Sequence, residues 1–111
     1  MPFDFGDVVL VPFPFTNQMT SKQRPAVIVS QRAYARARPD VVLMAITSQV
    51  RSTLGFADTL LSDWHNANLL KPSVVKPVFA TIEQDLVIKQ LGQLSEQDQA
   101  SLRLAIGQII G

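Results

Sequence analysis

Short apolar segments, rich in β-branched residues and ended by prolines or polar loops, recur along most of this 111-residue chain. Segments of this kind are typical of short β-strands. Pro12 and Pro14 force an extended path after the first segment, because each proline fixes its own φ and restricts the residue before it. At 111 residues, we expect one domain over residues 1–111 with a mainly β fold.

The apolar pattern predicts several strands along the chain. Residues 41–47 lack polar alternation, which indicates a strand buried on both faces. Pro77 predicts a bent or edge strand around it. The expected strands are residues 7–11, 24–30, 41–47, 56–61 (weaker), 73–82 and 86–94. The arginine-rich segment 31–40 suits either a helical turn or a basic loop.

Two helices are expected. A short one covers residues 62–67, with Ser62 or Asp63 as N-cap. The clearer one follows Ser95, where a Ser-x-x-acid start precedes apolar residues at helical spacing. Many short strands with a terminal helix predict a small, partly open β-barrel with small helices.

Composition excludes several kinds of site. The chain has no cysteine and a single histidine, so a thiolate or His-rich metal site is not expected, and we predict no metal or cofactor. No signal peptide or membrane span is evident, and a cytoplasmic location is expected. Residues 21–51 carry six basic side chains against one acidic. This block suits an anionic partner, or it is simply a solvated loop.

The strands at 24–30 and 41–47 follow one another and should pair antiparallel. If Ser30 faces Val41, then Arg24 faces Thr47, and directly opposed Cβ atoms lie about 5 Å apart. Guanidinium and hydroxyl groups together can bind a phosphate. A slip of one residue would place the two side chains on different faces.

Four ordered blocks, GDVVLVPFPFT, KQRPAVIVS, ITSQ and DWHNANLLKPSVV, resemble those of the MazF/PemK toxins. The tail LGQLSEQDQASLRLAIGQII resembles the closing strand and helix of that family, so the resemblance covers nearly the whole chain. It implies an SH3-like β-barrel, a homodimer and a cognate antitoxin. It also implies a metal-independent endoribonuclease that cleaves single-stranded RNA to 2′,3′-cyclic phosphate and 5′-hydroxyl ends.

The resemblance also implies residue roles. Arg24, before the first signature proline, would be catalytic, with Thr47 and Ser48 of the I-T-S block as its partners. Recognition is expected from the loops at 16–23 and 48–55. The expected RNA contacts are Thr16, Lys22, Gln23, Gln49 and Arg51.

Two departures from the family pattern affect these roles. Many members have a glutamate in the loop before the arginine, whereas Thr16–Gln23 contains no carboxylate. Arginine transfers protons poorly because its side chain stays charged, so the general base is unassigned. Asn68 stands where glycine is common, and asparagine tolerates left-handed backbone angles.

Two other functions are compatible with the same sequence. A gyrase-poisoning toxin of the same fold, as in the related CcdB proteins, or an inactive binding module would share the barrel.

Several other residues are expected to have structural roles only. His65 and Trp64 are expected to be structural, with Trp64 a packing anchor. Glu83 and Asp85 would share a strand face and are expected to be solvated. Phe13 and Phe15 are expected to cover the barrel, and Leu69 and Leu70 to be exposed.

Overall fold

A computed structural model describes residues 3–12 and 22–111 of the chain. These residues contain six β-strands and two α-helices. The strands are β1 (Asp7–Pro12), β2 (Gln23–Ile28), β3 (Asp40–Thr47), β4 (Thr59–Leu60), β5 (Val74–Glu83) and β6 (Lys89–Gln93). The helices are α1 (Arg32–Ala37) and α2 (Glu96–Ile109), with a 3-10 helix, η1, at Gln84–Leu86. Within these ranges no helix combines the length and the apolar character that a bilayer crossing requires.

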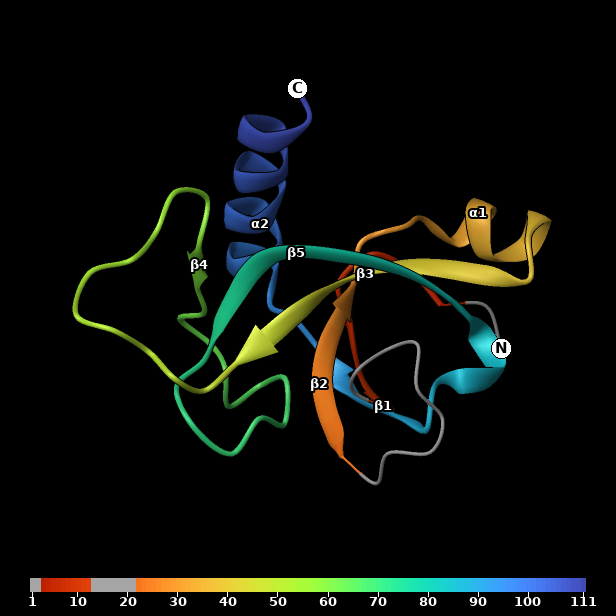
Figure 1. Cartoon of the computed structure of the whole chain (residues 1–111), viewed down its shortest axis with the longest axis horizontal. Helices are drawn as coiled ribbons and strands as arrows, with labels where there is room; N and C mark the ends of the chain where they lie inside the picture. Colours follow the sequence, from red (N-terminus) through yellow and green to blue (C-terminus); the bar gives the residue numbers. More distant parts are fainter. Residues whose placement is uncertain (1–2, 13–21) are drawn as a thin grey trace.

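The strands form one antiparallel sheet in the order β4-β5-β3-β2-β1-β6. The long strand β5 bends over the sheet, and α2 stands beside it near β4 (Figure 1). Two irregularities in register accompany this curvature, one between Val8 and Val9 and one between Met44 and Ile46. The expected partly open β-barrel with a C-terminal helix is confirmed.

The register between β2 and β3 is the one expected from sequence. Ala26 lies opposite Ala45, and Ile28 lies opposite Leu43. The recorded pairs stop before Arg24, which lies opposite Val11 of β1. The same offset, extended by two residues, would set Arg24 opposite Thr47, which stays a prediction.

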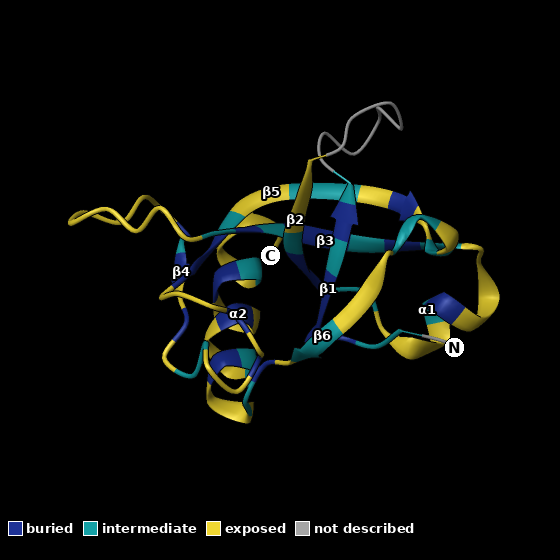
Figure 2. Ribbon diagram, turned by 90° about the horizontal axis from the view of Figure 1, so that it is seen from below, coloured by how far each residue is buried: buried dark blue, intermediate teal, exposed yellow. Residues whose placement is uncertain are grey.

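Both faces of the central strands are buried, as expected for β3 (Figure 2). Alternate residues enter two different cores, because successive strand side chains point to opposite faces. The first core gathers under α2 and includes Val8, Val27, Met44, Leu61, Val75 and Leu102. The second lies on the other face and includes Val9, Ile28, Val41, Leu43, Ala35 and Ile82.

Helix α2 begins as the sequence predicts. The Ser95 side chain accepts a hydrogen bond from the Asp98 backbone N–H at 3.2 Å, the expected N-cap. Leu102 and Ala105 are buried against the sheet, whereas Leu104 and Ile110 are 74% and 71% exposed. Full burial of a side chain such as Leu102 contributes roughly 1.5–3 kcal/mol.

The helix expected at 62–67 is wrong, since residues 62–68 form a series of turns. The backbone N–H groups of Ser62 and Asp63 donate to the two carboxylate oxygens of Asp98, at 2.9 and 2.8 Å. The backbone N–H groups of the two residues expected as N-cap are thus satisfied from α2. Asn68 has φ 61°, so the expected left-handed turn at this position is confirmed.

Other boundaries also differ from expectation. The strand expected at 24–30 ends at Ile28, and 31–40 contains the helix α1. The weak strand at 56–61 shrinks to β4, because Ala57 has φ 64° and cannot continue an extended chain. The strand expected at 86–94 is only β6, preceded by η1, so Asp85 shares no strand face with Glu83.

The structure tests the roles expected for several apolar residues. Pro77 lies in β5 opposite the irregularity of β3, so the predicted bend is confirmed. Trp64 packs against the first core. Leu69 is buried, contrary to expectation, and Leu70 is 93% exposed. Phe13, Phe15 and Thr16 lie outside the described residues.

Candidate functional site

Strand β3 ends at Thr47, where the chain leaves the sheet for an exposed loop. Residues 48–56 are all exposed, and the loop extends away from the body of the protein (Figure 2). Thr47 is half-buried, and its Oγ1 accepts a hydrogen bond from the Gln49 backbone N–H at 3.1 Å. This bond turns the chain sharply and fixes the hydroxyl at the entrance to the loop.

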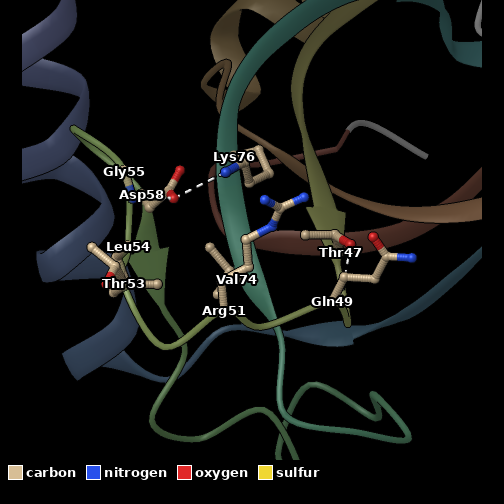
Figure 3. Close-up of a pocket in the computed structure, with 9 residues that line it drawn as sticks. All are labelled: Thr47, Gln49, Arg51, Thr53, Leu54, Gly55, Asp58, Val74 and Lys76. Atoms are coloured by element: carbon tan, nitrogen blue, oxygen red, sulfur yellow. Dashed lines mark hydrogen bonds and ion pairs between the residues drawn. The ribbon is translucent and has the colours of Figure 1, made fainter.

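A cavity of about 480 Å³ lies between this loop and β5 (Figure 3). Its volume falls in the range of roughly 300–1,000 Å³ that is usual for small-molecule sites. The side chains of Arg51 and Lys76 approach it from opposite sides (Figure 3). The lining residues are Thr47, Gln49, Arg51, Thr53, Leu54, Gly55, Asp58, Val74 and Lys76.

Strand β5 positions one wall of the cavity. Val74 pairs with Thr47 of β3, so the two strand ends stand side by side. Lys76 is two residues further and therefore faces the same side of the sheet as Val74. The register between β3 and β5 thus brings a hydroxyl and an ammonium group to one place.

Asp58 closes the far end of the cavity. Its Oδ2 accepts from the Lys76 ammonium at 2.9 Å and from the Gly55 backbone N–H at 2.7 Å. The Asp58 side chain is only 5% exposed, whereas that of Lys76 is 41% exposed. Burial acts to raise the pKa of Asp58, but the hydrogen bonds from Lys76 and Gly55 and the charge of Lys76 outweigh it, so the pKa is lowered. Asp58 is therefore a buried anion beneath a partly exposed cation.

The structure places the predicted site residues in two groups. Thr47, Gln49 and Arg51 line the cavity together. Ser48 is exposed between them. The remaining described candidates, Lys22, Gln23 and Arg24, are exposed at the start of β2.

Arg24 and Lys22 both take part in polar or ring contacts. Neither lines the cavity, so the Arg24–Thr47 pairing stays a prediction. The two groups flank the same end of the β2–β3 hairpin.

The sequence reading missed Asp58 and Lys76. Eighteen residues separate them, and neither belongs to a recognisable motif. Only the pairing of β3 with β5 brings Lys76 beside Thr47. Once that register is known, the alternation of β5 assigns Val74 and Lys76 to the cavity.

The chemical character of the site is cationic and rich in hydrogen-bond donors. Arg51 and Lys76 supply positive charge, while Thr47 and Gln49 supply a hydroxyl and an amide. Such groups bind phosphate or carbonyl oxygens. Among the residues described, no three His, Cys, Asp or Glu side chains gather as metal ligands do.

A comparison with protein families gives one match. Residues 4–110 match the model of the PemK-like, MazF-like toxin of type II toxin-antitoxin systems. The chain belongs to this family. Among curated protein sequences, none matches the chain significantly.

Solved structures of MazF-type proteins share the fold. An endoribonuclease in complex with its cognate antitoxin, from a mycobacterial species, superposes with a TM-score of 0.77 at 18% identity, covering 99% of this chain and 94% of that one. MazE–MazF from Deinococcus radiodurans gives 0.76 at 20% identity, with 100% and 97% covered. Toxin MazF-mt6 of Mycobacterium tuberculosis gives 0.73 at 22% identity, with 92% and 93% covered.

Proposed function

We propose that this MazF-family chain is a toxin that cleaves single-stranded RNA at short sequences without a metal ion and so inhibits translation. The observation that carries the proposal is the cavity that Thr47, Arg51 and Lys76 line together. A cavity with these groups suits single-stranded RNA, which is a polyanion with unpaired bases. Family membership supports the same activity.

The proposed reaction uses the ribose 2′-hydroxyl as nucleophile. Its oxygen forms a bond to phosphorus, the bond to the 5′-oxygen breaks, and the products carry a 2′,3′-cyclic phosphate and a 5′-hydroxyl. The 2′-proton passes to a base and the leaving oxygen takes up a proton. No side chain is assigned to the base.

The side chains at the hairpin end would stabilise the charge that develops on phosphorus. Arg24 is proposed to bind the non-bridging oxygens, because a guanidinium can donate two parallel hydrogen bonds to a phosphate. Thr47 and Ser48 are proposed to orient the same phosphate through their hydroxyls. Lys22, Gln23, Gln49 and Arg51 are proposed to hold the flanking nucleotides, together with Thr16.

The decisive experiment is incubation of the purified protein with a long RNA in EDTA. Discrete cleavage that disappears in Arg24→Ala, and persists in the exposed α1 variant Arg36→Ala, supports the proposal. The cleavage rate of Arg24→Ala is expected to fall by about 100-fold or more, as for loss of one donor that stabilises the transition-state charge. Intact RNA together with gyrase-dependent toxicity would identify a gyrase poison instead.

Three further properties belong to the same proposal. The chain is proposed to act as a homodimer in the cytoplasm and to be neutralised by a cognate antitoxin. Exposed apolar side chains support protein contacts, among them Phe56 at 76% and Leu70 at 93%. Light scattering of the purified chain would test the dimer, and a monomer at micromolar concentration would contradict it.

A further inference from the structure

The cavity beside Thr47 is lined by cationic and amide hydrogen-bond donors. Arg51, Lys76 and Gln49 bring guanidinium, ammonium and amide N–H groups to its lining. Among the described residues that line it, Asp58 alone carries a carboxylate, which is buried and whose Oδ2 already accepts from Lys76 and Gly55. A ligand that fits here therefore presents acceptor atoms to the protein.

The size and walls of the cavity suit a flat ring. Leu54 and Val74 provide apolar lining, and the volume of about 480 Å³ accommodates one base with its sugar. Thr47 borders the same space. A base bound here would be the neighbour of the phosphate that the proposed function places at Thr47.

We propose that this cavity binds one base of the substrate RNA beside the cleaved phosphate and selects guanine or uracil through Lys76. Asp58 is the positioning residue that holds the ammonium in place. The inference rests on the proposed ribonuclease function. Guanine and uracil present carbonyl oxygens where adenine and cytosine present amino groups. An amino group facing Lys76 would offer no acceptor to the ammonium and would itself lack an acceptor there, which is unfavourable.

Asp58 gives Lys76 its direction. A lysine ammonium sits on a flexible four-carbon stem, so its position is poorly defined without a partner. The 2.9 Å bond to a carboxylate that is itself held by the Gly55 N–H removes this freedom. The same carboxylate ties the end of the exposed loop to β5.

The first measurement compares cleavage rates on short RNAs. The preferred site is located on a long RNA, and each flanking position is then varied through the four bases under single-turnover conditions. At one position the wild type is expected to prefer keto bases over amino bases. Lys76→Met is expected to reduce this ratio by about 10-fold or more, as for loss of one charged hydrogen bond. Lys76→Arg should retain it, and so should Lys89→Met, the matched control on exposed β6.

Asp58→Asn separates positioning from charge. This variant keeps the ammonium and a side-chain acceptor for the Gly55 N–H. It is expected to lose the keto preference while binding RNA of any sequence at least as tightly as the wild type. A purely structural role for Asp58 would lower all rates together and leave the ratio unchanged, which would contradict the inference.

The outcomes separate this inference from the proposed function. If the wild type cleaves RNA and Lys76→Met keeps the same base preference at every position, the cavity does not read a base, although the ribonuclease stands. If the wild type cleaves no RNA, the proposed function fails. Fluorescence anisotropy with short single-stranded RNAs that differ at one base then decides: a preference for keto bases that is lost in Lys76→Met supports base selection by the cavity, and equal binding by both proteins overturns it.

Discussion

Thr47 is the residue at which strand, loop and cavity meet. Its hydroxyl is the acceptor for the Gln49 N–H and also lines the cavity. It therefore has two separable effects, one on the shape of the loop and one on the phosphate it is proposed to orient.

Thr47→Ala is expected to lower cleavage about 10-fold or more, because both effects are lost. Thr47→Ser keeps the hydroxyl and should retain most of the activity. Single-turnover rates with a fixed RNA measure both variants. An alanine variant as active as the wild type would show that the sequence-based register chose the wrong partner for Arg24.

Asp58 makes the free energy of unfolding of the protein depend on pH. Its lowered pKa means that its contribution is complete above the ordinary value of 3.8 and is lost as pH falls through the lower folded value. Wild type and Asp58→Asn should therefore differ in urea stability at pH 7 and converge in acid. A stability difference independent of pH would contradict the ion pair.

At the scale of elements, Asp98 joins the first turn of α2 to the turns at 62–68. It is 1% exposed, and its carboxylate receives two backbone N–H groups. Buried donors left without acceptors are costly. The loop after β4 is thus shaped by a side chain from the last helix.

Asp98→Ala is expected to lower the free energy of unfolding by about 2–4 kcal/mol, because Ser62 and Asp63 lose a charged acceptor. Glu96→Ala, in the same helical turn but exposed, is the matched control and should cost less than about 1 kcal/mol. Urea denaturation measures both. Equal effects of the two substitutions would show that the Asp98 bonds contribute little.

The local sequence pattern was sufficient to predict some elements of the fold but not others. The β2–β3 register followed from one assumed opposition, Ser30 with Val41, and the pairs Ala26–Ala45 and Ile28–Leu43 have the same offset. The turns at 62–68 were not, since their donors are satisfied from Asp98, more than thirty residues away. Likewise, Thr47 could be proposed from its block, whereas the Asp58–Lys76 pair exists only through tertiary pairing.

At the scale of the whole molecule, the small net charge of +1 hides an uneven distribution. Within the basic block, Arg32 is bridged to Asp4 and Arg38 to Asp40. The part of the block left to attract an anion is accordingly smaller than the sequence suggests. Arg51 stands apart in the exposed loop, at the cavity.

RNA binding should weaken as salt rises, because bound cations displace counterions from the phosphates. Arg51→Ala is expected to reduce the slope of log K against log salt by about 0.7, the value for one phosphate contact on a single strand. Anisotropy titrations at several salt concentrations measure the slope. An unchanged slope would place Arg51 away from the backbone.

The described residues that line the cavity all lie in the stretch from Thr47 to Lys76, and β1, β2 and α2 contribute none of them. Substitutions in the exposed loop at 48–56 therefore remove no core side chain. A lineage could accumulate changes there at little risk to folding. The fold thus leaves the exposed loop free to diversify on an unaltered barrel, and under the proposed function new sequence preferences would arise there.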